Sequence, residues 1–146
     1  MPIPTVTRDF ESFTKLELIK LCDDVVSGNP TTTNMAILFF CADTKGLWHG
    51  RARAKLARRF KHVRLEAIHA KRIVDIVINR FVAGTFSEQF KDQLRLVLHL
   101  DPIRILLAAR GCAQSTVPHV KKYSQWILSH DHPGQSTEQV APVNAC

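Results

Sequence analysis

The sequence lacks the features that mark membrane, secreted and metal-stabilised proteins. None of its apolar runs approaches the ~20 residues of a membrane-spanning helix, and the longest covers residues 35–42. Its first ten residues lack the basic and then apolar stretches of a secretory signal. The sequence contains no C-x-x-C pair, so the spacing predicts neither a structural zinc site nor a disulfide framework. A reducing, cytoplasmic location is therefore expected. The four cysteines are Cys22, Cys41, Cys112 and Cys146.

Catalytic signatures are missing as well. The sequence has no Gly-rich phosphate loop, no nucleophile elbow and no H-E-x-x-H motif. Its seven histidines are scattered and do not form a pattern that fixes a catalytic geometry. We therefore predict a protein that is not an enzyme, with no catalytic residue, no metal site and no cofactor.

Strand patterns are scarce, whereas helix signals are frequent. The hydrophobic fraction of 45% is ordinary for a globular protein with a core. Apolar positions recur at helical spacing between capping residues, glycines and prolines. The predicted class is all-α, a compact bundle of six or seven short helices or a stack of helical hairpins. We expect one domain over residues 14–129, an irregular lead-in over 1–13 and a flexible tail over 130–146. We expect a capping box at Thr14–Glu17 for the first helix, caps among Thr31–Thr33 for the second, and Asp101-Pro102 as the cap and first residue of the sixth. The expected helices cover about 14–27, 35–42, 50–63, 66–83, a segment after the Thr85–Glu88 capping box, 102–112 and a segment from Pro118.

The last two of these helices resemble a HEAT-type repeat. Val120 is followed by a basic residue, by the small Ser124 four positions later and by Leu128 four further on. A fainter version of the opening lies at 101–104, so the resemblance covers about residues 101–128. Residues 14–84 do not repeat it clearly, and an aromatic centre is unusual for that family. The resemblance implies stacked helical hairpins that serve as a scaffold for proteins or nucleic acids.

Positive charge is concentrated in one segment. The whole chain has 20 Lys or Arg and 13 Asp or Glu, a net charge of +7. Between Arg51 and Arg80 there are ten Lys or Arg against Glu66 and Asp75, a local balance of +8. The remainder of the chain sums to about −1. Such asymmetry indicates a surface for an anionic partner.

Helical geometry divides residues 51–64 into two faces. At about 100° per residue, the apolar Ala52, Leu56, Phe60 and Val63 fall on one side, where they can pack inward. Arg53 intrudes on that side, so we expect it at the helix end or extended toward solvent. The opposite side is strongly basic, and its like charges repel one another. It consists of Arg51, Lys55, Arg58, Arg59 and His62.

The basic face predicts binding of nucleic acid, RNA or DNA, or of another polyanion, with little sequence specificity. An acidic protein partner is an alternative. Another is that the face has no partner and is solvated or paired with acids of the first helix region, namely Glu11, Glu17, Asp23 and Asp24. The predicted nucleic-acid-binding residues are Arg51, Lys55, Arg58, Arg59, Lys61, His62, Arg64, Lys71 and Arg72.

A second hypothesis follows from the aromatic residues. The chain could be a helical-repeat adaptor that binds a protein through Trp48, Tyr123 and Trp126. Trp48 lies between two glycines in a predicted junction, where its ring is either a core plug or an exposed platform. Salt dependence of nucleic-acid binding distinguishes this hypothesis from the first.

Overall fold

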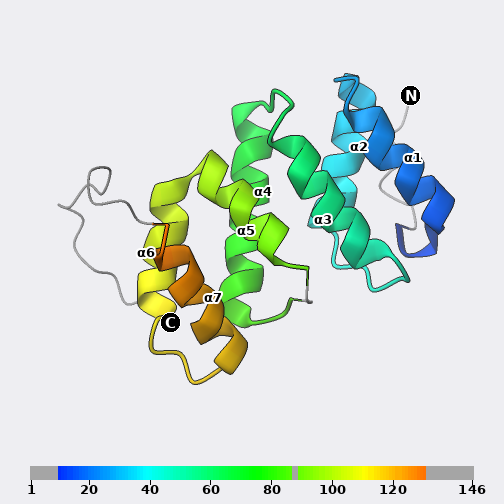
Figure 1. Ribbon diagram of the computed structural model, residues 1–146. Helices are drawn as coiled ribbons and strands as arrows, with labels where there is room; N and C mark the ends of the chain where they lie inside the picture. The colour runs from blue at the N-terminus through cyan, green and yellow to red at the C-terminus, as the bar shows by residue number, and fades with distance from the viewer. Residues whose placement is uncertain (1–9, 87–88, 131–146) are drawn as a thin grey trace. The chain divides into compact units, whose positions relative to one another are not determined.

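The computed structural model describes residues 10–86 and 89–130, and every regular element in these ranges is helical (Figure 1). The all-α prediction is confirmed. A short 3-10 helix precedes seven α-helices. These are η2 (Phe10–Ser12), α1 (Lys15–Val25), α2 (Pro30–Cys41), α3 (His49–Phe60), α4 (Ala67–Ala83), α5 (Lys91–Leu100), α6 (Pro102–Cys112) and α7 (Pro118–Leu128).

Local capping chemistry explains where two of the helices begin. Thr14 caps α1 with the predicted capping box, in which its hydroxyl accepts the Glu17 N–H and the Glu17 carboxylate accepts the Thr14 N–H. The Asp101 carboxylate accepts the Arg104 N–H at the start of α6, with Pro102 as the first helical residue, as predicted.

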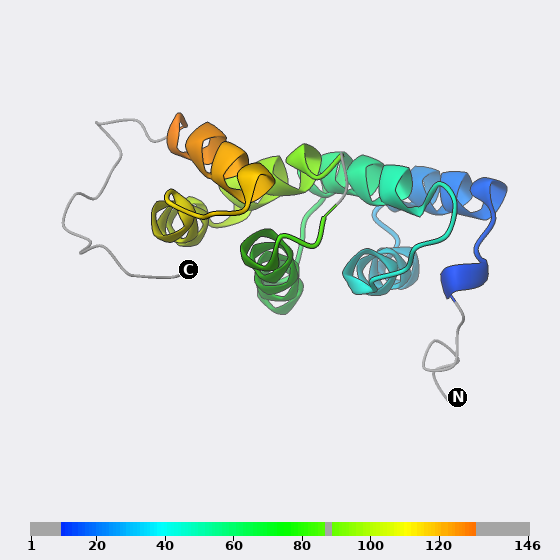
Figure 2. The same ribbon diagram turned by 90° about the horizontal axis from the view of Figure 1, so that it is seen from below.

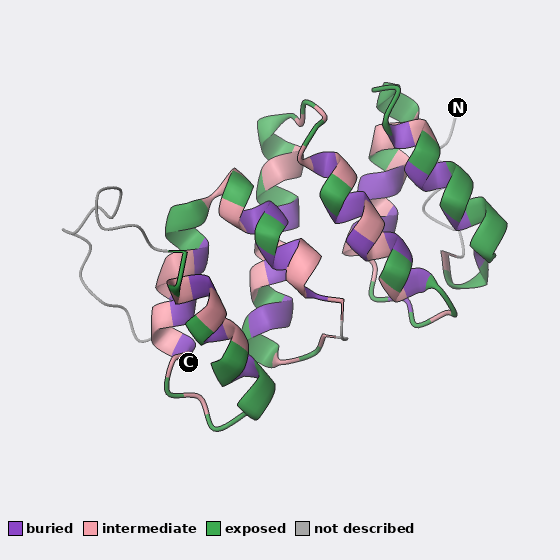
Figure 3. Cartoon of the chain, viewed as in Figure 1, coloured by how far each residue is buried: buried purple, intermediate pink, exposed green. Residues whose placement is uncertain are grey.

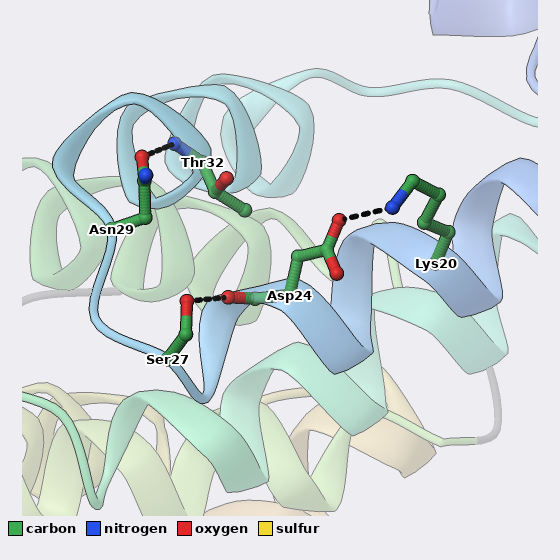
Figure 4. A network of polar contacts seen from close by, with 5 residues as sticks. All are labelled: Lys20, Asp24, Ser27, Asn29 and Thr32. Carbon is green, nitrogen blue, oxygen red and sulfur yellow. Dashed lines mark hydrogen bonds and ion pairs between the residues drawn. The ribbon is translucent and has the colours of Figure 1, made fainter.

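The cap of α2 differs from the expectation that threonines 31–33 supply it. The Asn29 side chain accepts N–H bonds from Thr31 and Thr32, at 2.9 and 3.1 Å. Figure 4 shows the bond from Thr32. Pro30 becomes the first helical residue, because its missing N–H needs no partner there. The Asn-Pro pair therefore starts the helix.

Two other helix limits also differ, the end of α3 and the start of α5. α3 runs from His49 to Phe60, so Val63 lies beyond its end, where the backbone turns with the His62 N–H bound to the Arg59 carbonyl. α5 begins at Lys91 without a side-chain cap. The capping box predicted for 85–88 falls partly outside the described residues.

The chain divides into two compact units, with the boundary between Ile73 and Val74 inside α4. In the first unit, α1 packs against both α2 and α3, and α2 packs against α3. Figure 2 shows α1 and α3 in one layer, with α2 in a second layer. Phe40 and Phe60 meet edge to face in this core, with ring centroids 5.6 Å apart.

In the second unit, α6 packs against α5 and α7. The α6–α7 hairpin is the segment for which the HEAT-like resemblance was noted. Leu94, Ile105 and Ile127 are fully buried in this unit. In both units the buried residues form stripes along the helices, with exposed residues on the opposite sides (Figure 3).

Further predictions concern the chain ends, the domain bounds, membrane-spanning helices and the cysteines. Most of the lead-in over 1–13 and nearly all of the tail over 130–146 lie outside the described residues, and the single domain over 14–129 stays a prediction. No helix in the described part of the chain has the length and hydrophobicity needed to span a membrane. Cys22 and Cys41 form no disulfide, whereas Cys112 is disulfide-bonded.

Candidate nucleic-acid interface

α3 has the two faces that its sequence predicted. Ala52, Leu56 and Phe60 are buried, with exposed fractions of 7% or less. Arg51 and Arg58 on the other side are exposed. Burial of the apolar stripe against α1 and α2 therefore holds the basic side chains at the surface.

One acid of α1 approaches this basic face. The Asp23 carboxylate lies 3.5 Å from the Arg59 guanidinium and 3.9 Å from the Lys55 ammonium, and both distances involve the same oxygen, Oδ1. One negative charge thus faces two positive charges. Roughly a third of the Lys55 and Arg59 side chains and over half of the Asp23 side chain are exposed, so solvent weakens both pairs. The alternative in which acids of the first helix region pair with the basic face is therefore correct for Asp23, which pairs with Lys55 and Arg59.

The other three acids proposed as covers have different partners. Glu11 accepts the backbone N–H of Lys45, at 2.9 and 3.1 Å to its two carboxylate oxygens. Glu17 completes the capping box of α1. Asp24 binds Lys20 on its own helix at 2.9 Å, and its backbone carbonyl accepts the Ser27 hydroxyl (Figure 4).

The remaining predicted basic residues follow α3 along the chain. Lys61, His62 and Arg64 lie in the turn between α3 and α4, and the last two are exposed. Lys71 and Arg72 lie on the exposed side of the first turns of α4. Within residues 10–86 and 89–130, no ion pair involves Lys61, Arg64 or Arg72. The structure thus gathers Arg51, Lys55 and Arg59 beside α1, with Arg58 exposed on the same helix and the other five predicted residues following α3 along the chain.

A buried polar network fixes the start of α3. His49 is fully buried and lies 3.1 Å from the Phe13 carbonyl through Nε2 and 2.7 Å from the Thr44 hydroxyl through Nδ1. A carbonyl only accepts, so Nε2 donates to Phe13, and in the neutral imidazole Nδ1 then accepts from the Thr44 hydroxyl. Gly46 makes room for the ring, because a Cβ there would lie 2.6 Å from His49 Nε2.

Arg53 belongs to the same network. Its guanidinium donates to the Ala42 carbonyl at the end of α2 and to both the hydroxyl and the carbonyl of Thr44. The expectation of Arg53 at the helix end or extended into solvent is therefore wrong. Local periodicity places it on the inner face correctly, but only the folded α2–α3 loop supplies the carbonyls that satisfy its charge there.

Trp48 precedes α3 in a left-handed backbone conformation, with φ of 72°. Trp48 is 36% exposed, so it lies at the surface and does not fill the core. The Lys15 ammonium lies 4.3 Å and the Arg51 guanidinium 5.0 Å from the ring centroid. These distances are typical of cation–π contacts.

Trp48 and the α1–α3 pair enclose a groove of about 290 Å³. Three cations, from both helices, stand at its rim, and the described lining contains no carboxylate. The groove and the role of Lys15 are not visible in the sequence, because no local pattern connects residue 15 with residues 48–55. We call it the α1–α3 groove; it is lined by Lys15, Leu18, Ile19, Cys22, Trp48, Arg51, Ala52 and Lys55.

The thiol in the groove is unsuited to nucleophilic chemistry. Burial raises the pKa of Cys22, although the nearby Lys55, Arg59 and Arg58 act in the opposite direction. A raised pKa keeps the thiol protonated at neutral pH, and the thiolate is the reactive form. Across the described residues, no group of three or more His, Cys, Asp or Glu is arranged to hold a metal ion.

The aromatic residues of the second unit have their own environment. Trp126 is partly exposed and has the Lys91 ammonium 4.9 Å and the Arg95 guanidinium 5.5 Å from its ring centroid. The Tyr123 ring packs edge to face against Phe86, with centroids 5.4 Å apart. Each of the two tryptophans in the chain is therefore accompanied by a lysine and an arginine.

Comparisons with known proteins reveal no relationship. No protein-family model matches the chain. A search of curated proteins finds no significant match. A search of solved structures likewise finds no significant match.

Proposed function

We propose that this chain binds nucleic acid, or a polyanion of similar charge density, through the basic face of α3 and the turn that follows it. The supporting observation is the charge balance at the α1–α3 surface. Asp23 faces both Lys55 and Arg59, while Arg51 contacts the Trp48 ring. An excess of positive charge therefore stays at the surface.

Physical chemistry favours a phosphate polymer for such a surface. Each phosphate that a cation neutralises releases condensed counterions, and the gain is large when several cations lie in one line. Solvent-exposed pairs such as those of Asp23 contribute about 0–1 kcal/mol each, so a phosphate can replace them readily. No feature of α3 resembles a base-reading motif, which supports binding with little sequence preference.

The cytoplasmic location and the HEAT-like kinship are part of the proposal. Cys22 and Cys41 form no disulfide, which supports a reducing compartment, whereas the disulfide of Cys112 does not. The α6–α7 hairpin supports a helical-repeat relationship for residues 101–128. Neither point determines the choice of partner.

The first prediction concerns the two exposed cations of α3. Arg51→Gln combined with Arg58→Gln removes two positive charges and leaves both Asp23 pairs in place. Binding to a single-stranded oligonucleotide should weaken about tenfold at low salt. The slope of log affinity against log salt should fall by roughly 1.4, because ~0.7 per lost phosphate contact is expected for single strands. Fluorescence anisotropy over a salt series measures both quantities.

The matched control changes the same amount of charge elsewhere. Lys121→Gln combined with Lys122→Gln removes two exposed cations of α7. This variant should retain the affinity and salt slope of the parent to within about twofold. Equal losses in both variants would show that only net charge matters, and an unchanged Arg51/Arg58 variant would contradict the proposal. Capture of an acidic protein by a chain that binds no oligonucleotide would favour the adaptor hypothesis.

A further inference from the structure

We infer that the α1–α3 groove accepts one nucleotide of a single-stranded nucleic acid, with the base against Trp48 and the apolar lining and the phosphate at Lys15, Arg51 and Lys55. The inference rests on the proposed function and goes further, because it names the form of the polymer and a contact to its bases. A surface that binds charge alone would not need the groove.

The chemistry of the groove matches the two parts of a nucleotide. Leu18 is 2% exposed and Ala52 7% exposed, so buried apolar side chains form the floor of the groove. Trp48 supplies an aromatic surface, and the described lining has cations and no acid. A volume of about 290 Å³ is at the lower end of known ligand sites, which suits one ring system with its attached groups.

The backbone of Trp48 is a second observation. A bulky residue with positive φ is strained, and Trp48 is the only non-glycine residue in this conformation within residues 10–86 and 89–130. Glycine would adopt the same conformation without strain. Compared with glycine, the tryptophan at this position contributes an aromatic ring to the lining of the groove. Strain of this kind is concentrated at functional sites.

The two cations beside the ring can serve the phosphate. Lys15 and Arg51 are exposed and contact the Trp48 ring in the free protein. A phosphate is a stronger partner for either charge than an aromatic face, because it forms charge-assisted hydrogen bonds. Movement of these long side chains to a phosphate would open the ring face to a base. Base–aromatic stacking combined with a positive groove is how single strands are bound without sequence preference.

A duplex does not fit this site. Bases in a duplex are already stacked, so they offer no free face to Trp48, and the groove accepts one ring system only. An aromatic side chain of an acidic peptide has similar chemistry, but the positive charge continues along Arg58, Arg59 and the turn after α3. That continuation suits a polymer with a charge on every unit.

The test compares strands that differ only in their bases. The protein carries Trp126→Phe, so that Trp48 is the only tryptophan and its fluorescence reports on the groove. The probes are a short single-stranded DNA, an abasic strand of the same length and charge, and a blunt duplex of the same sequence. We expect the intact strand to quench Trp48 and to bind at least about fivefold more tightly than the abasic strand.

A variant without the Trp48 ring shows whether that ring causes the difference in affinity between the intact and abasic strands. Trp48→Gly keeps every charge of the groove and suits the left-handed backbone. It should bind the intact and abasic strands with equal affinity, by anisotropy of labelled strands. A far-ultraviolet circular dichroism melt checks that the variant is folded. The abasic comparison in the Trp126→Phe protein does not depend on the Trp48 variant and decides the matter if that variant unfolds.

The outcomes separate this inference from the proposed function. Equal binding of intact and abasic strands, with weakening by the Arg51/Arg58 variant, would overturn the groove inference and leave the proposed function standing. A duplex that quenches Trp48 as strongly as the single strand would also overturn the inference. If no nucleic acid binds and a Glu-rich peptide containing phenylalanine quenches Trp48, both proposals fail.

Discussion

Two neighbouring acids show how much a single residue position decides. Asp23 and Asp24 are adjacent on α1, yet Asp23 faces Lys55 and Arg59 of α3, and Asp24 faces Lys20 of its own helix. The side chains leave the helix about 100° apart, so they reach different neighbours. The sequence predicts that both acids lie near the basic face and does not distinguish them, because the direction of α1 relative to α3 is a tertiary property.

This difference leads to a prediction for Asp23. Asp23→Asn removes the carboxylate that competes with phosphate for Lys55 and Arg59. Affinity for a single-stranded oligonucleotide should rise about two- to fourfold at low salt, because surface pairs contribute about 0–1 kcal/mol each. Anisotropy titrations at low and at high salt measure the gain, which should shrink as salt screens the charges.

Asp24→Asn is the matched control, since it makes the same change in net charge one residue away. It should alter the affinity by less than the Asp23 variant does. If the two variants bind equally well, the Asp23 pairs do not limit binding. Weaker binding by Asp23→Asn would mean that Asp23 positions the cations productively.

At the scale of elements, caps and apolar spacing predicted the helices well. The Thr14 capping box and the Asp101-Pro102 start are found where the sequence placed them, because both rest on bonds between residues three apart. The start of α3 was less predictable. It depends on contacts from Phe13 and Thr44 to His49, and a lone histidine between glycines gives no sign of such partners.

The junction before α3 can be tested through His49. His49→Ala would leave a cavity next to Phe39 and remove the two hydrogen bonds of His49, to the Thr44 hydroxyl and to the Phe13 carbonyl. We expect a loss of roughly 2–4 kcal/mol in the free energy of unfolding, from the cavity and the two lost buried hydrogen bonds together. Urea unfolding followed by circular dichroism gives this quantity.

His62→Ala serves as the comparison, because His62 is exposed in the turn after α3. Its free energy of unfolding should remain within ~0.5 kcal/mol of the parent. Similar stabilities for the two variants would show that the buried network does not hold α3 in place.

For the whole molecule, the uneven distribution of charge is the dominant property. The window from Arg51 to Arg80 has a balance of +8 in a chain of net charge +7, so the remainder is nearly neutral. Cations crowded onto one helix repel one another in the free protein. A bound polyanion relieves that repulsion and stabilises the folded state by its own binding energy.

A thermal measurement tests this coupling. Heparin at about 100 times its dissociation constant should add ~2.7 kcal/mol to the free energy of unfolding. That corresponds to a rise in Tm of roughly 5–10 °C for a chain of this size. Uncharged dextran should leave Tm unchanged, and salt near ~1 M should abolish the heparin effect. A salt-independent shift would contradict an electrostatic site.

The sequence by itself determined the helical class, most helix limits, the inward apolar stripe of α3 and the local excess of positive charge. These properties follow from residue periodicity, from caps that act over three or four positions, and from counting charges. Tertiary structure alone decided that Asp23 meets Lys55 and Arg59, that Arg53 is satisfied by the α2–α3 loop, and that Lys15 and Trp48 enclose a groove with α3. The physical reason is that each of these contacts joins segments whose approach depends on how the helices pack.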